Sequence, residues 1–114
     1  MRTPKIRPKH GPEYEIQQKI KKYLEDRGWF VVIITASLYL KGMPDLYATH
    51  RIYRGKWIEV KQGEKWKFTK EQKEKFPELL GKGTPIWIMF GADKQNYDLL
   101  FEPCNAPYWL ALKG

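Results

Sequence analysis

Two carboxylates and a lysine, spaced so that neighbouring strands could bring them together, are the residues of this chain best suited to chemistry. Asp45 follows Pro44, while Glu59 and Lys61 lie further along in the apolar segment Trp57-Ile58-Glu59-Val60-Lys61. Residues two apart in a strand point to the same face. Glu59 and Lys61 would therefore share one face, and a strand that begins near Asp45 and pairs with this segment would bring all three groups together.

This combination suits the hydrolysis of a phosphodiester. Mg²⁺ neutralises phosphate charge and lowers the pKa of a bound water, and one or two carboxylates suffice because it keeps several waters. We expect Asp45 and Glu59 to be the ligands, with the Val60 carbonyl as a third. Lys61 would position or deprotonate the attacking water, or stabilise developing charge. The simpler interpretation is a solvated ion pair, with Asp45 as a turn residue.

Composition limits the class of protein. The chain has 114 residues, 42% hydrophobic residues and one cysteine, Cys104. We expect one domain over residues 13–114, no transmembrane helix, no signal peptide, no internal disulfide and an intracellular, cytoplasmic setting. The formal net charge of +8 favours nucleic acid as partner, although a generally basic protein would show the same charge.

Hydrophobic spacing predicts an α/β fold. Apolar residues at helical intervals predict a helix over 13–27, and uncharged runs over 29–36 and 85–90 predict buried strands. Strands over 45–50 and 56–62 would form a hairpin that turns at Arg54-Gly55. Helices would cover the resulting mixed central sheet.

The second half of the chain contains a capping box, in which Thr69 caps a helix and Gln72 lies at its third position. We expect this helix to reach about residue 80, with a kink or an early end at Pro77. Residues 97–101 are predicted to form the last strand. The tail from Glu102 to Gly114 has no assignment.

Four segments together resemble the PD-(D/E)XK nuclease superfamily, in particular VRR-NUC domains and archaeal Holliday-junction resolvases. They are Gly42-Met43-Pro44-Asp45, the Ile58-Glu59-Val60-Lys61 strand, a first-helix glutamate and the Thr69-Lys70-Glu71-Gln72 helix start. The resemblance implies an αβββαβ restriction-endonuclease-like core, DNA cleavage that depends on Mg²⁺ or Mn²⁺, and a homodimer in the resolvase-like members. It maps the catalytic set onto Asp45, Glu59 and Lys61.

The resemblance also implies further site residues. Glu13 is favoured over Glu15 as the first-helix carboxylate because it lies on the stripe of Ile16 and Ile20, although both glutamates also suit a helix N-terminus. Gln72 could reach the site edge or serve only as a cap.

Basic residues beside the site and in the N-terminal arm are candidates for DNA binding. The arm, residues 1–12, includes Arg7 and Lys9, and Lys65-Trp66-Lys67 follows the Glu59 strand. Trp66 could stack on a base or pack against its own domain, and the arm could be an unstructured terminus.

These observations predict a divalent-metal-dependent DNA endonuclease that acts on branched or structured DNA. A phage or mobile-element homing or restriction enzyme of the same superfamily is the alternative. So is a non-catalytic DNA-binding module, against which the complete Asp-Glu-Lys set argues.

Overall fold

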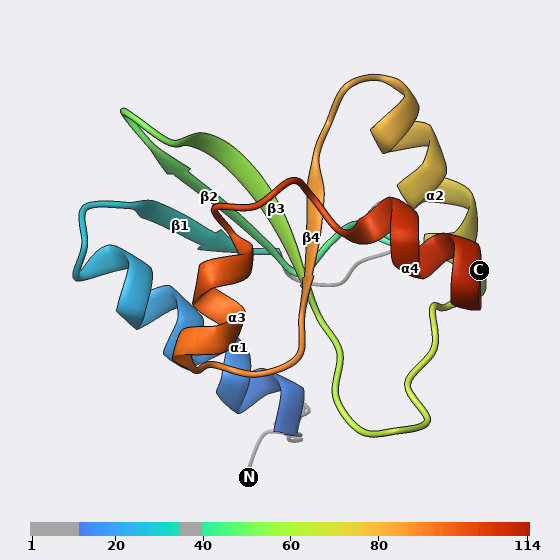
Figure 1. Ribbon diagram of the computed structural model, residues 1–114, viewed down its shortest axis with the longest axis horizontal. Coiled ribbons are helices and arrows are strands. Elements are labelled where there is room, and N and C mark those ends of the chain that lie inside the picture. The colour runs from blue at the N-terminus through green and yellow to red at the C-terminus, as the bar shows by residue number, and fades with distance from the viewer. Residues whose placement is uncertain (1–11, 35–39) are drawn as a thin grey trace, which may run out of the picture.

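A four-stranded sheet lies between two pairs of helices. The computed structural model describes residues 12–34 and 40–114. The sheet has the order β1-β2-β3-β4, and Figure 1 shows α1 and α3 beside β1 and β2, with α2 and α4 beyond β4. The elements are α1 (Pro12–Glu25), β1 (Phe30–Ile33), β2 (Leu46–His50), β3 (Arg54–Val60), α2 (Lys70–Gly81), β4 (Ile86–Met89), α3 (Lys94–Leu99) and α4 (Ala106–Lys113). The predicted mixed sheet with flanking helices is confirmed.

The connections set the direction of each strand. β1 pairs antiparallel with β2, and β2 antiparallel with β3 through a tight hairpin. β3 and β4 are parallel, so the chain must cross over between them, and α2 makes that crossover. The hairpin turn lies at Arg51–Tyr53, slightly before the predicted position, and Arg54 opens β3 with a φ of 66°.

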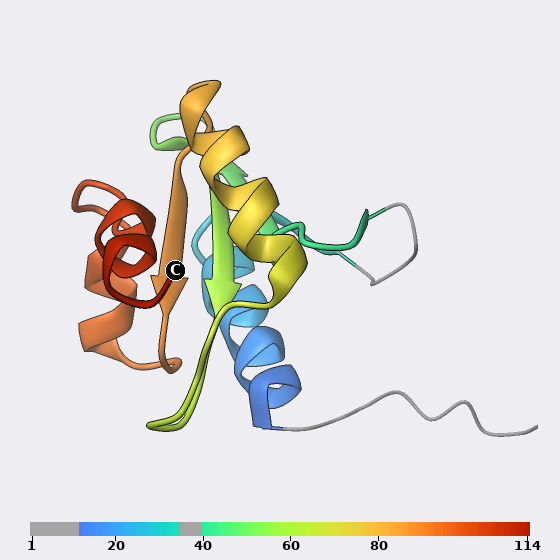
Figure 2. The same ribbon diagram turned by 90° about the vertical axis from the view of Figure 1, so that its right-hand side faces the viewer.

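Each face of the sheet has its own hydrophobic cluster. On one face, residues of α1 and residues in or directly after α3 pack on residues of β2 and β3. This cluster includes Ile20, Leu24, Tyr97, Leu100, Leu46, Ala48, Ile58 and Val60. Phe68, Phe76 and Ala106 pack with Ile86 and Ile88 on the other. Figure 2 shows α2 running alongside β3 and β4. The alternation along β3 therefore leaves Glu59 on the α2 side.

The outer edge of β4 is closed by two asparagine side chains. Asn105 accepts a hydrogen bond from the Ile88 N–H at 2.6 Å and donates to the Ile88 carbonyl at 2.9 Å, as a neighbouring strand would. Asn96 accepts from the Phe90 N–H at 2.8 Å. These contacts satisfy backbone groups that a sheet edge otherwise leaves unpaired.

Two sequence predictions about elements were wrong. Residues 97–101 do not form a strand, because Asp93 caps a helix, α3, by accepting from the Asn96 N–H. The strand expected over 29–36 covers Phe30–Ile33 among the described residues, residues 35 and 36 lying outside them, and it is not buried on both faces, since Phe30 is 64% exposed. The second helix ends at Gly81, close to the predicted residue 80. Of the two outcomes expected at Pro77, the early end does not occur, and Phe76, Leu79 and Leu80 pack the helix on the second cluster.

The tail that the sequence left unassigned contains α4. Pro107 lies in its first turn, where the missing N–H costs nothing. Trp109 and Leu110 pack on the second cluster. Among the helices of the described ranges, none is long and apolar enough to span a membrane.

Candidate active site

Asp45 is held where β1, β2 and β3 come together. Its Oδ2 accepts a hydrogen bond from the Val60 N–H at 2.8 Å, and its carbonyl accepts from the Ile34 N–H at 2.7 Å. Gly42 allows the turn before Asp45 to pack closely against α2. Its φ is 84°, and a Cβ there would lie 2.8 Å from the Glu71 carbonyl oxygen. The Gly-x-Pro-Asp spacing thus has a local cause: only glycine fits the turn against α2.

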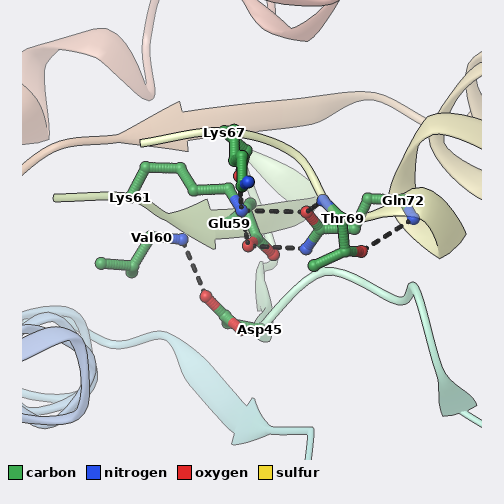
Figure 3. Close-up of polar contacts among 7 residues, drawn as sticks. All are labelled: Asp45, Glu59, Val60, Lys61, Lys67, Thr69 and Gln72. Carbon is green, nitrogen blue, oxygen red and sulfur yellow. Dashed lines mark hydrogen bonds and ion pairs between the residues drawn. The ribbon is translucent and has the colours of Figure 1, made fainter. Parts of the chain in front are cut away.

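Glu59 and Lys61 form a buried pair at the end of β3. The Lys61 Nζ lies 3.3 Å from the Glu59 Oε2, and the two residues are 6% and 3% exposed. The same ammonium donates to the Lys67 carbonyl and the Gln72 Oε1, both at 2.9 Å (Figure 3). A solvated ion pair is therefore not the arrangement found here.

Gln72 performs both roles that the sequence left open. As part of the capping box, its N–H donates to the Thr69 hydroxyl and its Oε1 accepts from the Thr69 N–H. Its Nε2 donates to the Glu59 Oε2 at 2.8 Å, and its Oε1 accepts from Lys61 (Figure 3). One side chain therefore couples the start of α2 to the acidic and basic members of the site.

Burial makes the two carboxylates costly to ionise in the protein alone. Desolvation, opposed by the hydrogen bond from Val60, raises the pKa of Asp45 to about 6, and the charge of Glu13 adds to this rise. Desolvation and the nearby Asp45 raise the pKa of Glu59 to about 8, against the opposing effects of Lys61 and Gln72. Burial and mutual repulsion thus oppose the ionisation of both acids, and a bound cation would favour it.

The donor set fits a hard divalent cation. The Oε1 of Glu59 is buried and has no hydrogen-bond partner, and an orphaned oxygen of this kind is costly unless something binds it. Asp45 and Glu59 supply the oxygen ligands that Mg²⁺ prefers. Within residues 12–34 and 40–114, no cluster of three or more His, Cys, Asp or Glu side chains is arranged to hold a metal. The Val60 carbonyl as third ligand stays a prediction.

The first helix places a carboxylate, that of Glu13, near enough to Asp45 to act on it through its charge. Glu13 is half-buried, whereas Glu15 is exposed. Of the two, Glu13 is the one whose charge raises the pKa of Asp45, which agrees with the preference drawn from the sequence. The structure does not join Glu13 to Asp45 and Glu59 as a preformed three-carboxylate group, so its role as ligand stays a prediction. The side chain of Gln17 lowers the pKa of Asp45 through a hydrogen bond.

In the basic segment after β3, Trp66 packs against its own domain. Its indole packs edge-on against Phe68 and Trp109, and the Lys113 ammonium lies 4.3 Å from the ring centre. These contacts support the packing interpretation over a free stacking surface. Lys65 and Lys67 are exposed. Arg7 and Lys9, with the rest of the arm up to residue 11, lie outside the described residues.

The Lys67 carbonyl is a site contact that sequence reasoning missed. It receives the Lys61 ammonium, but a backbone acceptor leaves no mark in residue type, so no signal could have identified it. The contact of Gln17 with Asp45 had a signal. Gln17 lies one helical turn after Glu13, on the same face.

The fold around this site is shared by a solved structure. A chain described as a VRR_NUC domain superposes with a TM-score of 0.65 at 22% sequence identity, over 79% of this chain and 95% of that one. This protein has the VRR-NUC-like nuclease fold. No protein-family model matches the sequence, and no curated protein matches it either. The resemblance drawn from four short segments is thus confirmed at the level of the fold.

Proposed function

We propose that this chain is a divalent-metal-dependent DNA endonuclease that hydrolyses phosphodiester bonds in branched or structured DNA. The observation that carries the proposal is the buried group of Asp45, Glu59 and Lys61, in which the Glu59 Oε1 lacks a partner. A binding module has no need for such a group, because burying two carboxylates and an ammonium destabilises the fold.

Asp45 and Glu59 would hold Mg²⁺, for which Mn²⁺ would substitute. When bound, the ion would neutralise phosphate charge and favour ionisation of the attacking water. The water oxygen forms the new bond to phosphorus as the bond to the leaving sugar oxygen breaks.

Lys61 acts through its charge. A lysine ammonium has three N–H donors, and in this structure the Glu59 carboxylate, the Lys67 carbonyl and the Gln72 amide oxygen surround it. Three acceptors fix the protonated form in place and leave no lone pair to take a proton. Lys61 is therefore assigned to stabilising phosphate charge in the transition state rather than to acting as a general base.

Resolving a four-way junction needs cuts on two strands. A homodimer related by a two-fold axis presents two such sites to two strands, and we propose this assembly for the active form. Gel filtration with light scattering tests it, because a monomer that nonetheless cuts junctions symmetrically would contradict it.

Cleavage assays test the activity. A four-way junction, a flap and a linear duplex are each incubated with Mg²⁺, with Mn²⁺ and with chelator, using the native protein and an Asp45→Asn variant. We expect metal-dependent cutting of the branched substrates by the native protein only. Calorimetric titration of Mg²⁺ without DNA gives a second readout, in which Asp45→Asn should lose binding. Absence of metal-dependent cutting by the native protein overturns the proposal, and a defined cut in linear duplex favours the restriction or homing alternative.

A further inference from the structure

The end of the sheet farthest from Glu59 carries an open hollow of about 620 Å³. Its lining includes Phe30, Thr49, Arg51, Arg54 and Gly55, and we refer to it as the hairpin hollow. Both arginines are exposed, and the lining contains no carboxylate. Two guanidinium groups without a competing acid form a site for an anion, and the planar guanidinium suits the two oxygens of a phosphate.

One side of the hairpin hollow lies on the same face of the sheet as the carboxylate of Glu59, whereas Arg54, an odd number of residues before Glu59, belongs by the alternation of β3 to the other face, so the hollow reaches around the tip of the hairpin. Phe30, Thr49 and Gly55 form one cross-strand row. Along β3, Gly55 and Glu59 differ by an even number of residues, so both point to the α2 side of the sheet. The hairpin tip and the end of β3 lie at opposite ends of the strand in Figure 1.

Among the residues that the structure describes, no helix packs over β1 on the face between the two sites. α2 and α4 pack on β4 and on Trp57 of β3, whereas Val32 is 37% exposed and Phe30 64% exposed. Tyr47 lies between, with its ring centre 4.9 Å from that of Trp57. An extended polyanion could therefore follow this face from the hairpin hollow to Asp45 and Glu59.

We propose that the hairpin hollow binds the phosphate backbone of a duplex DNA arm, about five base pairs from the bond that is cut. The proposal rests on the proposed function. Arg54 precedes Glu59 by five residues along β3, which corresponds to roughly 17 Å at about 3.3 Å per residue. One strand of DNA advances about 3.4 Å per base pair, so the contact falls near the fifth. A hollow of this volume accommodates more than one phosphate, and phosphate contacts set the register of a protein on DNA.

A branched substrate with one arm of variable length tests the proposal. The arm, closed by a tetraloop, is varied from 3 to 12 base pairs, and binding is measured with the Asp45→Asn background so that the DNA stays intact. Arg51→Gln/Arg54→Gln is compared with Lys22→Gln/Lys94→Gln, which removes the same charge from α1 and α3 on the opposite face, where both lysines are exposed. Thermal unfolding confirms that each variant is folded.

We expect the affinity of the parent protein to rise once the arm exceeds about five base pairs, and the arginine variant to lack this rise. Its salt slope should fall by roughly two, since each phosphate contact on duplex DNA contributes about 0.9. Arg51→Lys/Arg54→Lys should keep most of the salt slope. An unchanged length dependence in the arginine variant, or an equal loss in the lysine control, overturns the proposal.

The outcome is separable from that of the proposed function. A native protein that cuts branched DNA with Mg²⁺ but shows no loss specific to the arginine pair refutes only the hairpin hollow. A native protein that binds no DNA refutes both proposals.

Discussion

The two ends of the β2–β3 hairpin both carry charge, but they differ in burial. At one end, Glu59 and Lys61 are almost inaccessible to water, and two hydrogen bonds and an ion pair hold the lysine in place. At the other end, Arg51 and Arg54 are exposed and have no carboxylate beside them in the hairpin hollow. Buried charges destabilise a fold unless something compensates them, whereas exposed charges cost little. Under the two proposals, the first end would carry out chemistry at a fixed point, and the second would bind DNA reversibly in a salt-dependent way.

The largest expected effect separates catalysis from binding. Asp45→Asn keeps the shape of the side chain but removes the charge that holds a cation, so the single-turnover cleavage rate with Mg²⁺ should fall at least about a hundredfold. The affinity for DNA should change little, because the exposed arginines are untouched. A variant that cuts at the native rate would show that the buried end is structural.

Gln72→Met tests the coupling between the start of α2 and the site. The substitution removes an acceptor from Lys61 and a donor from Glu59, both buried, so we expect a loss of about 1–3 kcal/mol in the free energy of unfolding and a ten- to hundredfold fall in cleavage rate. Denaturant titration and single-turnover kinetics measure the two effects.

Thr69→Ala provides the control for Gln72, since it removes the cap and leaves the Gln72 contacts with Glu59 and Lys61. It should cost about 1 kcal/mol of stability and leave the cleavage rate within a few-fold of native. Equal kinetic losses in the two variants would mean that Gln72 acts only through the cap.

The raised pKa of Glu59 predicts how stability depends on pH. Its folded pKa of about 8 lies above the ordinary value of 4.5, so between these two pH values the folded state holds a proton that the unfolded state has released. The stabilising contribution is complete below pH 4.5 and is lost as pH rises through 8. Without metal, the native Tm should fall between pH 6 and 8.5 by about 10 °C more than that of Glu59→Gln.

Divalent metal should reverse this trend, because it binds the ionised carboxylates. The rise in Tm on adding Mg²⁺ should be larger at pH 8.5 than at pH 6, and Glu59→Gln should lack the difference. A gain from Mg²⁺ that does not vary with pH would argue against Glu59 as a ligand.

The sequence predicted the buried end better than the hairpin end. Glu59 and Lys61 obey the two-residue period of a strand, and Gly42, Thr69 and Gln72 have strict local requirements, so their types and spacing indicate their positions. The hairpin hollow had no such signal, because it depends on which strip of the sheet the helices leave open. The open strip could not be predicted because two of the helices were not. Residues 97–101 were interpreted as a strand from their apolar pattern despite the cap at Asp93, and α4 had no assignment.

The outer edge of β4 shows the same limit in another way. Asn105 occupies the cap position of α4 without a capping bond from its side chain, because its amide instead pairs with Ile88. A sequence pattern can propose a cap at an asparagine, but only the packed fold decides which backbone receives it.

The smallest expected effect concerns Gly55, in the row that forms the hairpin hollow. A Cβ there would overlap the Tyr47 hydroxyl and crowd its ring, so Gly55→Ala should displace Tyr47 and cost about 1 kcal/mol of stability. Gly81, at the end of α2, faces open space, and Gly81→Ala should instead stabilise the protein by about 0.5–1 kcal/mol.

Denaturant titration distinguishes the two signs, and the rate of cleavage at saturating DNA should stay native in both variants, since neither residue contacts Asp45 or Glu59. If Tyr47 borders the path of the DNA arm, Gly55→Ala alone should weaken binding to long arms and spare short ones. A loss of cleavage rate in Gly55→Ala would mean that the hairpin end positions the chemistry itself, and the division of roles between the two ends would then be wrong.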